Sequence, residues 1–152
     1  MITIQNTQRT IVYNTRKLRR DVAIILKYLG YETFDIGIRL TTNKTIRFYN
    51  REYRKKDKAT DILSFAYHPH IQAGEIIIAH TPEDRNLGDL IISMQYVKKA
   101  AHELGVSLEE RMQVLIVHGI CHLLGYDHEQ DADYEVMHAK EKELLAQLRN
   151  LS

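Results

Sequence analysis

Three histidines have a spacing that allows them to bind one metal ion together. His118 and His122 lie four residues apart in a segment of helical pattern, so both rings project from one face. Gly125 provides a turn after them, and His128 lies six residues beyond His122. Three neutral imidazoles leave one tetrahedral position of a zinc ion open, as in catalytic rather than structural sites. The spacing predicts one zinc ion per chain, bound by His118, His122 and His128.

Other interpretations of this segment stay open. The three histidines can be unrelated side chains, two of them buried and one exposed. The spacing HxxxHxxGxxH also occurs in metzincin proteases, but Gly119 stands here where those enzymes have a glutamate. A peptidase without that carboxylate lacks its general base, so a zinc peptidase is the weaker interpretation. Cys121 is interpreted as a small buried hydrophobe in preference to a fourth ligand.

A basic segment precedes the histidines in the chain. Residues 44–58 contain seven basic and two acidic residues, a local charge of +5, whereas the whole chain has a net charge of +1. Its basic side chains recur every three or four residues, on the side opposite Ile46, Tyr49 and Tyr53: Lys44, Arg47, Arg51, Arg54 or Lys55, and Lys58. A solvated helix face is the alternative interpretation. Beside a metal-hydrolase pattern, the stripe favours a nucleic-acid substrate.

Length and composition restrict the class of protein. A chain of 152 residues corresponds to one domain, residues 1–152, that can bury its own core. The single cysteine excludes an internal disulfide framework and indicates a reducing compartment, so we expect a cytoplasmic protein. The N-terminal segment lacks a signal-peptide pattern, and no apolar run approaches the roughly 20 residues of a membrane span, so no membrane partner is expected.

The elements that position these residues follow from hydrophobic periodicity and capping residues. Asn14 or Thr15 and Ser107 are suitable helix caps, and Gly30, Gly105 and Gly125 are suitable helix ends. Strands are expected over residues 1–7, 31–40, 61–67 and 89–93, with a candidate strand at 75–79 inside the irregular stretch 68–86. Helices are expected over residues 15–29, 42–53, 94–104, 108–124 and 133–148. Three or four strands with about five helices predict an α+β or α/β fold.

Several segments resemble one known family. The stretch HGICHLLGYDH, residues 118–128, closely resembles the HGxLHLxGYDH signature of the YbeY proteins, bacterial metal-dependent endoribonucleases implicated in ribosomal RNA maturation. NREYR at 50–54, TDILSF at 60–65 and GDL at 88–90 are similar to LNxxYR, TDVLSF and GDI of that family. Ala59 and Ala66 stand at frequent proline positions, and Cys121 at a usual leucine position. These departures concern loop and packing positions.

The resemblance implies a single α+β domain: a mixed sheet packed with helices, the histidine helix in the core, and a cleft beside it. It implies that His118, His122 and His128 bind zinc and that Arg54 corresponds to a functionally important arginine of the family. It further implies a zinc-dependent endoribonuclease in rRNA maturation and ribosome biogenesis. Its partners would be RNA, in particular ribosomal RNA, and ribosomal proteins.

We therefore expect metal-assisted hydrolysis of a phosphodiester bond in single-stranded RNA, with His118 and Arg54 as catalytic residues. The metal would activate a water molecule or polarise the phosphate for attack by the ribose 2′-OH. Arg54 would hold the phosphate through its planar donors, unless it forms an ion pair with Asp57 or Asp61. Asp127 is a candidate base, although support of the site or a turn cap fits it better. The rival function is a non-catalytic, zinc-stabilised ribosome-assembly factor.

Overall fold

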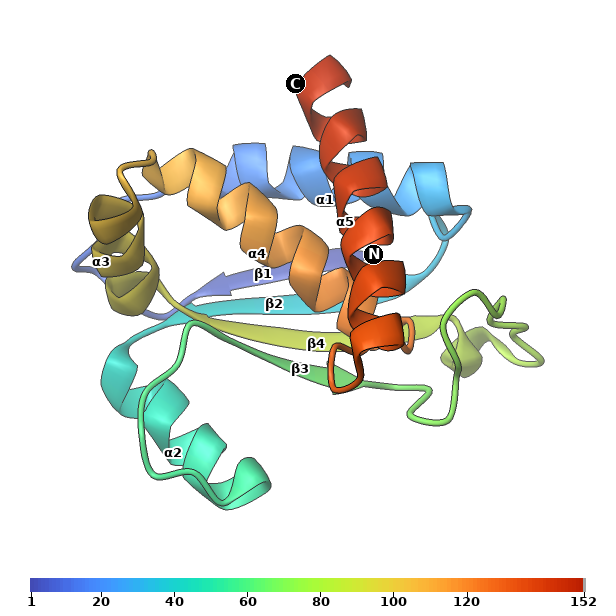
Figure 1. Cartoon of the computed structure of the whole chain (residues 1–152), viewed down its shortest axis with the longest axis horizontal. Helices are drawn as coiled ribbons and strands as arrows, with labels where there is room; N and C mark the ends of the chain where they lie inside the picture. The colour runs from blue at the N-terminus through green and yellow to red at the C-terminus, as the bar shows by residue number, and fades with distance from the viewer. Residues whose placement is uncertain (152) are drawn as a thin grey trace.

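A four-stranded mixed sheet carries helices on both of its faces in the computed structural model, which describes residues 1–151 (Figure 1). Helices α1, α4 and α5 cover one face, and α2 lies on the other (Figure 1). The elements in chain order are β1 (Ile2–Asn6), α1 (Thr15–Leu29), β2 (Asp35–Thr41), α2 (Asn43–Arg54), β3 (Ile62–Ala66), the short 3₁₀ helix η1 (Pro82–Asp84), β4 (Asn86–Ser93), α3 (Met94–Leu104), α4 (Leu108–Leu123) and α5 (Asp131–Leu151). This is the single α+β domain that the sequence predicted.

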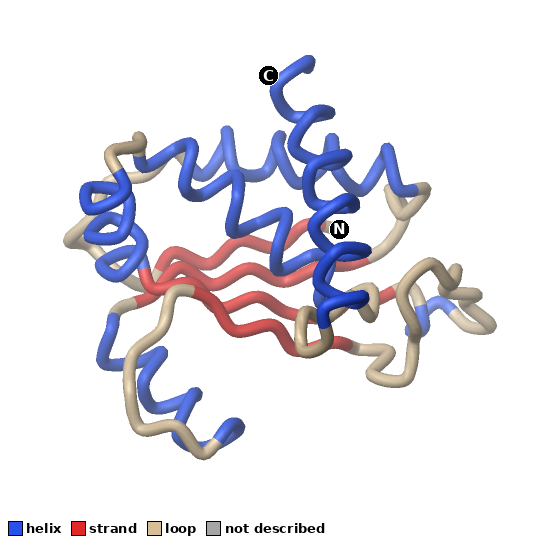
Figure 2. The backbone as a smooth tube through the Cα atoms, in the orientation of Figure 1, coloured by secondary structure: helices blue, strands red, loops and turns tan. Residues whose placement is uncertain are grey.

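The strand order is β1-β2-β4-β3, so β4 lies between β2 and β3 (Figure 2). The strands β1, β2 and β4 are parallel, and β3 runs antiparallel to β4. Because β3 is an edge strand, the two faces of the sheet meet along it without a further strand between them.

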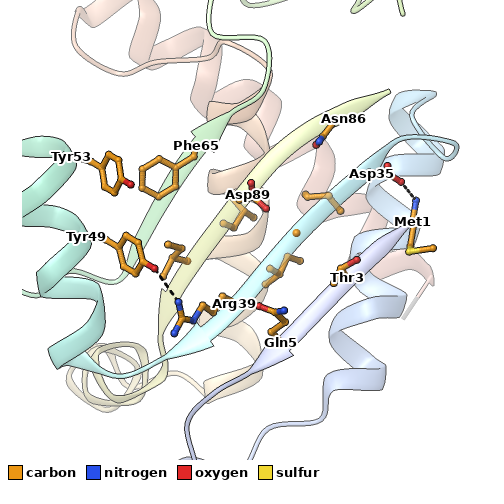
Figure 3. A pocket seen from close by; sticks show the side chains of 15 residues that line it. Met1, Thr3, Gln5, Asp35, Arg39, Tyr49, Tyr53, Phe65, Asn86 and Asp89 are labelled. Atoms are coloured by element: carbon orange, nitrogen blue, oxygen red, sulfur yellow. Dashed lines mark hydrogen bonds and ion pairs between the residues drawn. The ribbon is translucent and has the colours of Figure 1, made fainter. Parts of the chain in front are cut away.

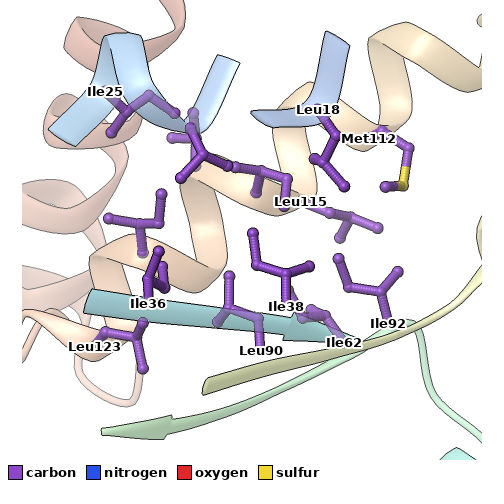
Figure 4. Packing of buried hydrophobic residues seen from close by; sticks show 14 of the residues in the cluster. Leu18, Ile25, Ile36, Ile38, Ile62, Leu90, Ile92, Met112, Leu115 and Leu123 are labelled. Carbon is purple, nitrogen blue, oxygen red and sulfur yellow. The ribbon is translucent and has the colours of Figure 1, made fainter. Parts of the chain in front are cut away.

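Alternate residues of the strands face the two sides of the sheet. Ile62, Leu90 and Ile92 point into the main core beneath α1 and α4 (Figure 4). Leu63 and Ile91 point the other way and pack with Ile46 of α2 in a second, smaller cluster. The period of two in side-chain direction therefore places α4 and α2 on opposite faces.

The helix ends follow the predicted capping chemistry. The Asn14 side chain accepts hydrogen bonds from the backbone N–H groups of Arg16 and Lys17, both at 3.1 Å. Ser107 Oγ accepts from the backbone N–H of Glu110 at 3.1 Å. These bonds satisfy donors that the first turn of a helix leaves without a backbone partner. Gly30 closes α1 in the left-handed conformation, at φ 83°.

Two expectations about local structure differ from the fold. The second strand begins at Asp35, because Tyr31 and Phe34 pack edge to face in a buried turn that follows Gly30. Residues 75–79 form no strand. Ile77 is the one buried residue among these five, and its backbone N–H donates to the Tyr31 hydroxyl at 3.1 Å. The helix expected over residues 42–53 is present as α2, which ends at Arg54, because the next residue, Lys55, is left-handed (φ 59°). Within residues 1–151, no helix has the length and apolar character that a membrane crossing requires.

Candidate metal centre

The three predicted ligands meet at the C-terminal end of α4. His118 and His122 lie one helical turn apart, and His128 lies in the connection between α4 and α5. One ligand nitrogen from each ring can be chosen so that all three lie within 4.8 Å of one another. The Nε2 atoms of His118 and His122 are 3.1 Å apart. Zn–N bonds of about 2.0–2.1 Å in a tetrahedral site separate nitrogens by roughly 3.3 Å, so the cluster fits a zinc ion with little adjustment.

Hydrogen bonds on the far side of two rings orient them for metal binding. His118 Nδ1 donates to a carboxylate oxygen of Glu141 on α5 at 2.9 Å, and His122 Nδ1 donates to the backbone carbonyl of Tyr126 at 3.0 Å. Both acceptors keep the ring proton on Nδ1, which leaves the Nε2 lone pair free for a metal. Burial, and then the neighbouring His118 and His128, lower the pKa of His122. The ring is therefore held in the neutral form that binds metal.

Two glycines allow the chain to build this arrangement. A Cβ at Gly119 would lie 2.7 Å from Cδ1 of Ile62 and 2.9 Å from Cδ2 of Leu90, so the helix rests directly on the sheet there. Position 119, which carries the glutamate in metzincins, thus faces the core and not the metal. Gly125 has φ +91°, and a Cβ there would collide with the backbone of Ile71. This close approach and the left-handed turn together require glycine.

A cleft of about 650 Å³ opens beside His122. The irregular stretch after β3 forms one wall, with Pro69 and Gln72, and the connection between α4 and α5 supplies Asp127. Residues 69–73 of the irregular stretch thus border the cleft. Asp127 accepts a hydrogen bond from the His128 backbone N–H at 2.7 Å, so it caps the turn that carries the third histidine.

Cys121 lies in the hydrophobic core and outside the metal-ligand cluster of the described chain. Burial raises the pKa of its thiol to about 12. The side chain therefore remains a neutral, apolar group at physiological pH, as the sequence analysis preferred.

Arg54 is the one predicted site residue that lies apart from the cluster. It ends α2, on the face of the sheet opposite α4, and its side chain is exposed. The ion pairs considered for it are made by other arginines: Asp57 pairs with Arg47 at 2.8 Å, and Asp61 with Arg111 at 3.6 Å. Among residues 1–151, Arg54 has no ion pair or side-chain hydrogen bond, so its guanidinium is free to bind an anion.

Sequence reasoning missed Glu141. Its contact with His118 spans 23 residues and depends on how α5 packs against α4. The acidic residue lies in an amphipathic helix among other charged side chains, and nothing in its local pattern distinguishes it from them.

Comparisons with known proteins found matches over nearly the whole chain. The model of the family described as endoribonuclease YbeY matches residues 3–149. Endoribonuclease YbeY of Homo sapiens is 37% identical over 147 residues, which cover 97% of this chain and 87% of that protein. The Geobacter sulfurreducens endoribonuclease YbeY is 36% identical over 151 residues, covering 98% and 96%. The solution structure of TM1509 from Thermotoga maritima matches with a TM-score of 0.64 at 22% identity, covering 97% and 89%, and so shares the fold.

Proposed function

The chain belongs to the endoribonuclease YbeY family of phosphodiester hydrolases, and from this premise we propose that residues 1–152 form one zinc-dependent domain that cleaves single-stranded RNA. The substrate class that we propose is ribosomal RNA during its maturation and ribosome biogenesis, with ribosomal proteins as further partners. The buried free thiol of Cys121 is in keeping with a reducing compartment, so the cytoplasm belongs to the proposal.

The single observation that supports this function best is the convergence of three imidazoles beside an open cleft. His118, His122 and His128 would hold one zinc ion and leave its fourth position free. When bound, zinc supplies a Lewis acid that can activate water or polarise a phosphate oxygen. Glu141 keeps His118 in the correct tautomer, and Asp127 keeps the turn before His128 closed. The chain's own residues thus contribute orientation and preorganisation.

Arg54 would hold a phosphate of the substrate. Its free guanidinium offers planar, bidentate donors, which match phosphate oxygens better than a lysine does. Because α2 and α4 lie on opposite faces, an RNA strand that reaches both must cross the edge strand β3. The phosphate that Arg54 binds would then be one that flanks the scissile bond.

A cleavage assay tests this function. Purified protein is loaded with zinc and mixed with an end-labelled RNA that contains single-stranded regions, at two salt concentrations. We expect His118→Ala to abolish cleavage and Arg54→Ala to weaken both binding and cleavage, while His102→Ala, a change of an exposed histidine on α3, cleaves as the wild type does. Equal trace cleavage by all four proteins would mean a contaminating nuclease and would contradict the proposal.

The same preparations distinguish the enzyme from a zinc-stabilised assembly factor. Met137, Leu144 and Leu148 of α5 are buried in the main core, so the helices around the cluster pack without help from a metal. We expect the metal-free protein to keep its helical circular dichroism and its cooperative melting. Unfolding on removal of zinc would favour the assembly factor instead.

A further inference from the structure

A second binding surface lies on the face of the sheet away from the histidines. Helix α2 covers only the β3–β4 side of that face, and a groove of about 580 Å³ remains between α2 and β1 (Figure 3). Its volume is in the range of small-molecule and cofactor sites. The groove is separate from the cleft beside His122, which lies at the end of α4.

Aromatic side chains form one wall of the groove. The rings of Tyr49 and Tyr53 are stacked, with centroids 6.0 Å apart and planes at 11°, and Phe65 of β3 meets Tyr53 edge to face at 5.3 Å (Figure 3). Tyr53 is 65% exposed, which is unusual for a large ring that contributes to a packed wall. The exposed face of the Tyr53 ring is thus available for a ligand to stack on.

The floor of the groove carries both hydrogen-bond donors and hydrogen-bond acceptors. Arg39 of β2 donates to the Tyr49 hydroxyl at 3.1 Å, which fixes its guanidinium at the edge of the aromatic wall. Asp89 of β4 and Gln5 of β1 point into the same groove (Figure 3). Within the described chain, the side chains of Asp89 and Gln5 make no hydrogen bond or ion pair. Acceptors and donors are therefore available to a ligand with hydrogen-bonding edges.

The helix that carries the aromatic wall also carries the positive charge. The exposed basic residues of α2 and its C-terminal extension are Lys44, Arg47, Arg51, Arg54, Lys55, Lys56 and Lys58. Only Arg47 and Arg51 among them form ion pairs within residues 1–151, and Asp57 and Glu52 are their partners. These side chains lie on the side of α2 opposite Tyr49 and Tyr53, so within the groove itself the positive charge comes from Arg39. An aromatic wall with a guanidinium at its edge is complementary to a base and a neighbouring phosphate.

We propose that this groove binds unpaired bases of single-stranded RNA. A base stacks on Tyr53, its edge pairs with Asp89 and Gln5, and a neighbouring phosphate lies against the Arg39 guanidinium. Proteins recognise single-stranded RNA in this manner, by stacking on aromatic rings and by hydrogen bonds to exposed base edges. The inference rests on the proposed function, because it assumes an RNA substrate, and it adds a place where that substrate is held.

One strand of the sheet, β3, touches both the histidine helix and the groove. Ile62 of β3 contacts Gly119, the residue after His118, on one face of the sheet, and Phe65 of the same strand lines the groove on the other face. An RNA chain held in the groove can thus cross the edge of the sheet at β3 toward the histidines. The geometry separates the site that holds the RNA from the site that cuts it.

Fluorescence tests the stacking directly, because the chain contains no tryptophan. The change Tyr53→Trp introduces one reporter in the groove, and Tyr28→Trp introduces one at a half-exposed position on the opposite face. Both are made in the His118→Ala background, in which we expect RNA to be bound and not cut. We expect unstructured RNA to quench the Tyr53→Trp emission saturably, inorganic polyphosphate to leave it unchanged, and Tyr28→Trp to respond to neither.

Affinity provides the second measurement. In the same background, Tyr53→Ala should weaken binding of the RNA about tenfold or more, the usual effect of losing one stacked base, whereas Tyr28→Ala should bind as the parent does. Absence of quenching, quenching by polyphosphate, or unchanged affinity of Tyr53→Ala would overturn the inference. Quenching by an unstructured acidic peptide but not by RNA would also overturn it, because the groove would then belong to a protein partner.

The outcomes also separate this inference from the proposed function. If zinc-loaded wild type cleaves RNA while the groove variants bind it normally, the groove assignment fails and the endoribonuclease stands. If RNA quenches the reporter but the zinc-loaded wild type cuts nothing, RNA binding in the groove stands and the catalytic proposal fails.

Discussion

The two faces of the sheet are made by neighbouring residues of the same strands, and they differ in almost every physical property. On the covered face, Leu90 is fully buried beneath α4 and belongs to the core that supports the histidines. On the open face, the preceding residue, Asp89, is exposed in the groove. The covered face provides rigidity, which a metal centre requires of its ligands. The open face provides accessible polar and aromatic groups, which a large flexible ligand requires.

Truncation of neighbouring residues should separate the faces most clearly. Leu90→Ala should destabilise the protein by about 2–5 kcal/mol, because it leaves a cavity where α4 meets the sheet. Asp89→Ala should change stability by no more than about 0.5 kcal/mol, as substitutions on open surfaces do. Urea denaturation followed by circular dichroism measures both. Similar losses in the two variants would contradict the division into a structural and a binding face.

The support that the covered face gives to the metal can be tested at Glu141. Glu141→Gln should weaken zinc binding about 10- to 100-fold, because the neutral amide no longer holds His118 as a carboxylate does. Glu143→Gln, two residues away and bonded to Tyr28 and Lys140, is the matched control and should leave zinc affinity unchanged. Competition against a chelating dye measures the affinity without any assay of RNA cleavage. Equal affinities would leave Glu141 without a role at the metal.

Alanine at two glycines on opposite faces of the sheet should change the stability of the fold differently. Gly119→Ala forces a methyl group between Ile62 and Leu90, which costs about 1–3 kcal/mol, and the better helix propensity of alanine returns at most about 1 kcal/mol. At Gly37 the added Cβ meets only the Asp89 carboxylate, which can turn toward solvent. Gly37→Ala should therefore be neutral or slightly stabilising. Thermal melting measures both, and a stable Gly119→Ala protein would mean that α4 is not held tightly on the sheet.

The smallest expected effect is at the exposed ion pair of the basic segment. The Arg47 guanidinium lowers the pKa of Asp57, so the pair stabilises the fold above the ordinary carboxyl pKa and loses this contribution as the pH falls through the lowered value. Asp57→Asn should melt slightly below the wild type at pH 7, and the difference should shrink as the pH falls through the lowered pKa of Asp57. High salt should remove the difference at pH 7. A difference that persists at high salt or below that pKa would point to a role other than charge pairing.

Local chemistry explains which parts of the fold the sequence predicted. The caps at Asn14 and Ser107 and the turn at Gly30 depend on a few adjacent residues, so helices α1 and α4 were located within one residue. The spacing of His118 and His122 depends on one helical turn, so their clustering was predictable as well. The capping residues and the histidine spacing each involve only a few neighbouring residues in the sequence, fewer than one whole helix contains.

Long-range packing explains what the sequence did not reveal. The candidate strand at 75–79 has a β-like run of isoleucines, but its backbone meets the Tyr31 hydroxyl and no neighbouring strand. The contact of Glu141 with His118 exists only after α5 has docked on α4. The groove on the open face depends on where α2 lies across the sheet, which no local pattern of residues 44–58 specifies.

The central position of β4 has a consequence for how the chain folds during synthesis. Ile38 of β2 and Ile62 of β3 are hydrogen-bonded neighbours of a strand that the ribosome makes only afterwards, since β4 spans Asn86–Ser93. Until β4 emerges, β2 and β3 have no common partner, and non-local pairing of this kind is slow. Glu141 emerges later still, on the last helix. A nascent chain should therefore acquire its sheet before it acquires a fully oriented metal centre.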